Sequence, residues 1–102
     1  MKIVLMVLLT LLSFSATAHD QQHRIIYQAS DLVSWCRDEA QARYIAQNIT
    51  PYNWTASYHD SSNILYVDGR LRVHGSDVEV HCRLASGARL EYGVIEIDDP
   101  GF

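Results

Sequence analysis

The stretch LYVDGRLRVHGSDVEVHCRL, residues 65–84, decides the fold because it reads as two strands joined by a tight turn. Apolar and polar residues alternate on both sides of Gly75-Ser76, a dipeptide typical of a two-residue hairpin turn. Counting outward from this turn places Val73 opposite Val78 on the apolar face. We therefore expect a hairpin with one buried face and one face in solvent.

The same register matches polar residues across the other face of the hairpin. The predicted pairs are Arg72 with Glu79, Arg70 with His81, and Asp68 with Arg83. A slip by one residue would exchange the two faces, so the apolar pattern specifies which side chains are buried. His81 and Cys82 are neighbours in one strand, so their side chains leave opposite faces and cannot form a nucleophilic Cys-His pair.

The remaining sequence predicts one helix followed by strands. The helix is expected from Leu32 to about Asn48, with Ser30 or Asp31 as its N-cap and Pro51 beyond its end. The predicted strands are a short one within Arg24–Ala29, then Tyr52–His59, Ile64–His74, Asp77–Ala85 and a weaker one over Leu90–Ile97. We expect an α+β fold in which the N-terminal helix packs on one face of a three- to four-stranded antiparallel meander. This order of elements resembles the cystatin-type topology, and the resemblance implies the fold only.

The first eighteen residues, MKIVLMVLLTLLSFSATA, have the pattern of a secretory signal peptide. A lysine precedes an apolar run that is short for a membrane span, and Ala16-Thr17-Ala18 forms a cleavage site. An uncleaved membrane anchor is the alternative interpretation. We expect a periplasmic or secreted protein with no transmembrane segment after cleavage at Ala18.

After the signal peptide, residues 19–29 are expected to form a polar leader with the short strand, residues 30–98 a single α+β domain, and residues 99–102 a loose tail. The formal net charge of the whole chain is −4, and its one lysine, Lys2, lies in the signal peptide. An acidic balance argues against nucleic acid as the main partner.

Cys36 and Cys82 are the two cysteines of the chain. An exported protein with an even number of cysteines is expected to join them, and the long loop between them would make this disulfide worth about 4 kcal/mol. A zinc site is the weaker interpretation because the cysteines lack the close spacing of zinc ligands.

Gly69 and Trp54 are predicted to be structural residues. A turn centred on Ser61-Ser62 would place Trp54 beside Gly69, with Cys82 on the other side of the glycine. The absent side chain would then leave room for both the indole ring and the disulfide.

Glu39 and Arg43 stand four residues apart in the order that favours an ion pair on a helix. They fall within the apolar arc of the predicted helix. Two interpretations stay open: a pair at the rim of a partly covered face, or a buried structural pair that forms an internal polar site.

The polar face of the predicted sheet contains the candidate binding residues, which are Asn53, Tyr66, Asp68, Arg70, Arg72, Glu79, His81 and Arg83. This face is either the ordinary solvated side of the sheet or a recognition surface whose arginines hold carboxylates, glycans or the acidic residues of a protein. No pattern for acid-base hydrolysis, a Ser-His-Asp triad or phosphate binding accompanies it. We therefore expect a non-enzymatic interaction module without a cofactor.

Copper handling is the alternative function. Cleavage after Ala18 would give His19 a free α-amino group beside its imidazole, with His23 close by, and such nitrogen donors suit Cu(II). An unstructured polar leader is the simpler interpretation. A small inhibitor or hydrolase is a third class, which no motif supports.

Overall fold

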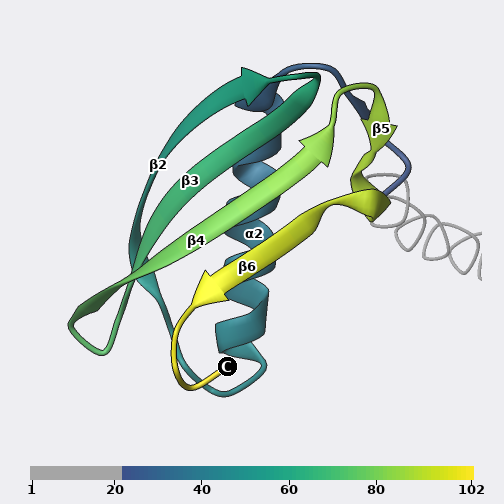
Figure 1. Ribbon diagram of the computed structural model, residues 1–102. Helices are drawn as coiled ribbons and strands as arrows, with labels where there is room; N and C mark the ends of the chain where they lie inside the picture. Colours follow the sequence, from purple (N-terminus) through teal and green to yellow (C-terminus); the bar gives the residue numbers. More distant parts are fainter. Residues whose placement is uncertain (1–21) are drawn as a thin grey trace, which may run out of the picture.

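The computed structural model describes residues 22–102, so the predicted signal peptide and His19 lie outside the described residues. The helix α2, Val33–Ile45, packs behind an antiparallel sheet (Figure 1). The strand order is β2-β3-β4-β6, and the strands are Tyr52–Ser61, Ile64–Val73, Ser76–Ala85 and Val94–Asp98. The predicted α+β fold class is confirmed.

Short elements connect this framework at both ends. β1, Ile25–Ile26, pairs with β5, Ala88–Arg89, in a separate two-stranded sheet. The 3-10 turn η2, Ala29–Leu32, leads into α2, so Ser30 and Asp31 lie inside this turn and make no side-chain cap. A second 3-10 turn, η3 over Leu90–Tyr92, precedes β6, which shortens the last predicted strand at its start.

The buried face of α2 follows the helical period. Cys36, Ala40 and Tyr44 are buried at intervals of four residues, so they lie on one side of the helix. The helix ends earlier than Asn48 because Asn48 adopts a left-handed conformation, with φ of 62°. The N–H of Ile49 then donates to the Tyr44 carbonyl at 3.0 Å, the bond that closes a Schellman motif.

The β3–β4 hairpin turns one residue earlier than the sequence predicts. His74 and Gly75 have φ values of 52° and 79°, as a two-residue type I′ turn requires, and Val73 faces Ser76 across it. Every cross-strand pair is therefore shifted by two positions from the prediction. The two faces stay as predicted because side chains alternate with a period of two. The error arose because histidine accepts positive φ more readily than most residues.

The β2–β3 hairpin turns one residue later than predicted, at Ser62-Asn63, so its pairs are also shifted by two positions. A bulge at Asn53, with φ of 54°, then inserts one residue between Tyr52 and Thr55. Tyr52 consequently faces Arg72 on the polar side of the sheet, whereas strict alternation predicted it beside Trp54.

Trp54 nevertheless packs on Gly69, as predicted. A Cβ at position 69 would lie 2.6 Å from Trp54 Cζ3, which is closer than packed atoms approach. Gly69 pairs with Val80, however, and Cys82 pairs with Val67. The glycine therefore makes room for the indole ring, and the prediction that it also borders Cys82 directly across the hairpin was wrong. A second contact of this kind, between Trp35 and Gly93, joins α2 to the start of β6.

The Cys36–Cys82 disulfide ties the middle of α2 to β4, with the two Cα atoms 6.0 Å apart. Both cysteines are buried within an apolar core that α2 and the sheet enclose. No charged side chain among the described residues is buried. Arg43 is exposed and Glu39 half-buried, and no ion pair joins them in the described part of the chain. The buried-pair interpretation was therefore wrong.

The C-terminal residues contact the end of α2, although the sequence predicts a loose tail over 99–102. The Tyr44 hydroxyl donates to Asp99 Oδ2 at 2.7 Å. Phe102 packs edge-on against the Tyr44 ring, with the centroids 4.7 Å apart. Burial, followed by the adjacent Asp99 carboxylate, raises the pKa of Tyr44. The Gly101 N–H and then the Tyr44 hydroxyl lower the pKa of Asp99.

Candidate functional site: the outer face of the sheet

We use the term outer face for the side of the sheet that points away from α2. Its polar residues come from all four strands: Tyr52, Asn53, Thr55, Ser57, His59, Tyr66, Asp68, Arg70, Arg72, Asp77, Glu79, His81, Arg83, Glu96 and Asp98. All eight predicted binding residues lie on this face. None of the other described elements packs over it, since α2 lies on the opposite side (Figure 1).

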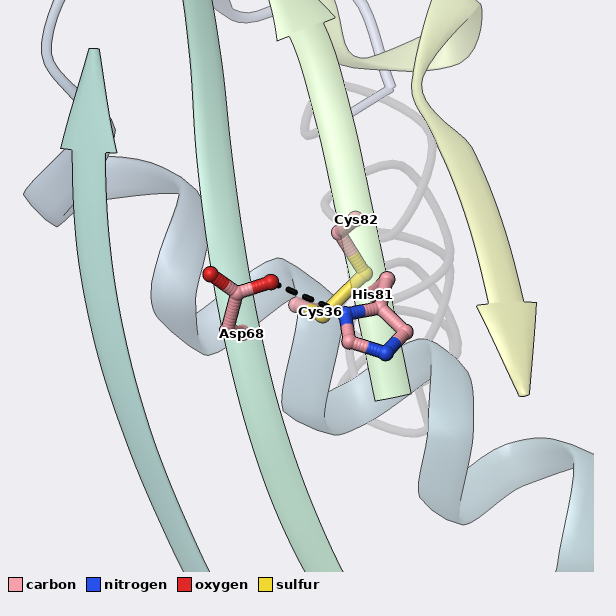
Figure 2. The surroundings of a disulfide bond; sticks show 4 residues. All are labelled: Cys36, Asp68, His81 and Cys82. Carbon is pink, nitrogen blue, oxygen red and sulfur yellow. Dashed lines mark hydrogen bonds and ion pairs between the residues drawn. A yellow bond between two sulfur atoms is a disulfide. The ribbon is translucent and has the colours of Figure 1, made fainter. Parts of the chain in front are cut away.

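Asp68 occupies the middle of the outer face and contacts two imidazoles. Its carboxylate lies 2.8 Å from His81 Nδ1 on β4 and 3.8 Å from His59 Nδ1 on β2. Figure 2 shows the His81 contact in front of the sheet and the disulfide of Cys82 behind it. Neighbouring residues of β4 thus serve different faces, as the alternation predicts.

The arginines of the outer face differ in how firmly they are paired. Arg72 Nε donates to Asp77 at 3.0 Å, and this bond, followed by the Asp77 charge, raises the pKa of Arg72. Arg83 donates to Glu96 at 3.2 Å. Arg70 is held more loosely, because its nearest carboxylate oxygen, on Glu79, is 3.9 Å away.

These partners correct the predicted pairs. The shift of two positions brings Asp77 to Arg72, Glu79 to Arg70 and His81 to Asp68. The predicted Arg72–Glu79, Arg70–His81 and Asp68–Arg83 pairs were wrong for the same reason. Asp77 and Glu96 were absent from the predicted set because their partners depend on the true turn and on the pairing of the last strand.

His59 was also absent from the predicted set, although it alternates correctly onto the outer face. Its ring stacks on Tyr66, with centroids 4.9 Å apart and planes inclined by 12°. The two rings form a flat aromatic border at one side of Asp68. A correctly placed turn would have paired His59 with Tyr66 across the two strands, and this pairing would have added His59 to the predicted set.

A shallow hollow of about 330 Å³ lies at the centre of the outer face. Its side chains combine hydroxyl groups, carboxylates, one guanidinium and one imidazole, and they belong to Thr55, Ser57, Asp68, Arg70, Glu79 and His81. The hollow therefore offers hydrogen-bond donors and acceptors next to each other. Arg70 is the arginine that lines it, and its donors are the least engaged of the three arginines described above.

The hollow contains a serine, an aspartate and a histidine, but their order does not suit nucleophilic catalysis. Ser57 pairs with Asp68, and Asp68 pairs with His81, so the carboxylate lies between the other two groups. A catalytic triad needs the imidazole between the hydroxyl and the carboxylate, where it accepts the proton. This row is therefore better suited to binding than to acyl transfer.

The copper hypothesis depends on His19, which the structure does not describe. His23 is described, and its exposed Nδ1 lies 3.8 Å from Glu91. Within residues 22–102, no three side chains of His, Cys, Asp or Glu gather as metal ligands. Copper binding at the N-terminus stays a prediction.

A larger cavity, of about 480 Å³, lies beside α2 and the N-terminal segment. Its walls include Arg24, Asp31, Trp35, Arg37 and Glu39, so both charge signs are present. Gln22, the first described residue, also lines it.

The chain matches no protein-family model, no curated protein and no solved structure. Across residues 22–102, no helix combines the length and the apolar character that a membrane span needs.

Proposed function

We propose that the protein is a small exported binding module that recognises a polar partner through the outer face of its sheet. The observation that carries this proposal is the central hollow, where loosely held Arg70 lies among the carboxylates of Asp68 and Glu79. Export is supported by the predicted signal peptide and by the disulfide, since disulfides persist in oxidising compartments.

The chemistry of the hollow favours a partner that presents acceptors and donors side by side. A guanidinium binds a carboxylate through two parallel hydrogen bonds, and Arg70 has free donors for such a bond. Asp68 and Glu79 would accept hydrogen bonds from the partner's hydroxyl or amide groups. An acidic segment of a protein and an acidic glycan both carry this combination.

Binding at this site would exchange internal pairs for external ones. The Arg70–Glu79 contact is long and solvent-exposed, so breaking it costs little. The shorter Arg72–Asp77 and Arg83–Glu96 pairs would stay in place and hold the border of the hollow. Arg70 is therefore expected to contribute more to binding than Arg72.

The test is a pull-down from the compartment to which the protein is exported, together with an array of acidic glycans. Arg70→Ala should reduce capture at least about tenfold, the loss expected for one charge-assisted hydrogen-bonded pair. The matched control is Arg37→Ala, which removes an exposed arginine from α2 on the other side of the sheet. Equal capture by both variants would contradict the proposal.

A further inference from the structure

The two edges of the main sheet differ in how well they are protected. β6 is a short edge of five residues that includes the acidic Glu96 and Asp98. β2 is an edge of ten residues, all exposed except Trp54. From Trp54 to His59 it contains no lysine, no proline and no acidic residue. Proteins normally blunt long edges with such residues or with bulges, so the segment Trp54–His59, which lies between the bulge at Asn53 and Asp60, lacks the usual protection against pairing with another strand.

The register shows which backbone groups β2 leaves free. Ser61 and Ile64 flank a two-residue turn and therefore form a hydrogen-bonded pair, after which such pairs alternate along the strands. Ser57 and Thr55 thus direct their N–H and C=O groups toward β3. Ala56 and Tyr58 direct theirs to the open edge, and no backbone bond described outside the sheet involves them. In the described part of the chain, Figure 1 shows no helix or strand along this edge of β2, and η2 comes near only its C-terminal end.

From these observations we infer that a second copy of this chain pairs with β2, strand to strand and antiparallel, about a twofold axis at Ser57. In this register Tyr58 lies opposite Ala56 of the second copy, so a large side chain meets a small one. Tyr58 is 56% exposed in the single chain and gains cover from the pairing. Thr55 lies opposite His59, and the two Asp60 side chains stay apart.

Neighbouring antiparallel registers are less favourable. Moving the axis to Asp60 places two carboxylates directly opposite each other, and moving it to Tyr58 places two large phenol rings opposite each other. Like charges in directly opposite positions destabilise a sheet. The Ser57 axis avoids both pairs, whereas axes at Ala56 and His59 set Tyr58 opposite Trp54 or Asp60, so side-chain size and charge together favour the Ser57 axis.

The pairing joins two sheets into one of eight strands with both helices on the same side. Thr55 and Ser57 line the hollow of each copy, so the two hollows would meet at the axis. The inference does not rest on the proposed function, because the pairing involves backbone groups of β2 whether or not the hollow binds a partner.

The first experiment is sedimentation of the purified, oxidised protein over a wide range of concentrations. We expect a monomer–dimer equilibrium that tightens as salt rises, since each copy carries a net negative charge and repels the other. Ala56→Pro removes one outward N–H per copy and should weaken the dimer at least about tenfold. A wild-type protein that stays monomeric at every concentration would overturn the inference.

Tyr58→Lys supplies a second variant, since an edge lysine opposes pairing without changing the strand backbone. Tyr92→Lys is its control, because Tyr92 has a similar exposure of 61% and lies outside β2. Circular dichroism checks that each variant folds. Dimerisation of the folded Tyr58→Lys protein at the wild-type strength would place the interface elsewhere and refute β2 pairing.

The axis itself is tested by cysteine crosslinking. Ser57 faces Ser57 in a pair that is not hydrogen-bonded, where Cα atoms about 4.5 Å apart suit a disulfide. Ser57→Cys should therefore form covalent dimers much faster than Ser76→Cys, a matched exposed serine on β4. Equal rates for the two variants would contradict the Ser57 register.

Discussion

The two faces of the main sheet share the same strands but depend on different interactions. On the inner face, Leu71, Val80 and Cys82 are buried against α2, and contacts there are short and apolar. On the outer face, Asp68, Arg70 and His81 are each about half exposed and are held by ion pairs in water. Stability should therefore depend on the inner face and recognition on the outer face, even at adjacent positions of one strand.

The disulfide is the inner-face feature whose removal should cost most. Replacing both Cys36 and Cys82 by serine should lower the free energy of unfolding by about 4 kcal/mol, because the disulfide closes a loop of 46 residues in the unfolded chain. Denaturant unfolding of the oxidised wild type and the double variant measures this loss. A loss below about 1 kcal/mol would mean that packing alone holds α2 on the sheet.

Gly69→Val tests the packing of Trp54 on the inner face. The new side chain would overlap the indole ring, so we expect a loss of about 2–3 kcal/mol with the disulfide still formed. The control is Arg70→Val, which introduces the same residue one position along on the outer face. If both variants unfold at the same denaturant concentration, the close approach of Trp54 to Gly69 is wrong.

Much of this two-faced arrangement could be predicted from residues 65–84. Alternation placed Val67, Leu71 and Val80 on one side and Asp68, Arg70 and His81 on the other, and the structure keeps that division. The pairs across the strands could not be predicted, because the register depends on whether His74 or Ser76 shares the turn with Gly75. The two choices preserve every face and differ in every contact.

The contacts between elements that are distant in the chain also could not be predicted from the sequence. Glu96 reaches Arg83 because β6 adds to β4, and the pattern of the last strand did not specify its neighbour. The packing of Trp35 on Gly93 joins α2 to the residue before β6. No hydrophobic pattern in the sequence relates these two positions. The bulge at Asn53 moved Tyr52 to the outer face, because one inserted residue reverses the alternation before it.

Tyr44→Phe tests the contact between α2 and the C-terminal residues. Losing the hydrogen bond to the exposed Asp99 carboxylate should cost about 1 kcal/mol at neutral pH. The raised pKa of Tyr44 means that its contribution is present below pH 10.0 and is lost as pH rises further. Melting temperatures should therefore converge for wild type and variant in alkali. A difference that persists unchanged there would contradict this contact.

The lowered pKa of Asp99 means that the same contact loses its stabilising effect at low pH. A depressed carboxyl pKa contributes stability above the unfolded value of 3.8 and loses it as pH falls through the folded value. Asp99→Asn should remove this part of the acid sensitivity. An unchanged acid transition in that variant would show that other carboxyl groups determine it.

Arg72→Ala should have the smallest effect on stability. The Arg72–Asp77 pair is exposed and screened by solvent, so its removal should leave the free energy of unfolding nearly unchanged. Leu71→Ala, its neighbour on the inner face, should cost about 2–5 kcal/mol because Leu71 is fully buried. Thermal melts of this adjacent pair compare the two faces directly. Similar losses in both would mean that the faces are not energetically distinct.

Recognition by the outer face is tested most directly by site-specific photo-crosslinking in the native compartment. A photoreactive residue at Asp98 lies on the outer face opposite Glu79 and away from β2, whereas one at Arg43 lies on the exposed side of α2. We predict one dominant adduct from position 98, none of it from position 43, and its loss when Arg70→Ala is added. The same adducts from both positions, or an adduct that survives Arg70→Ala, would contradict recognition through the outer face.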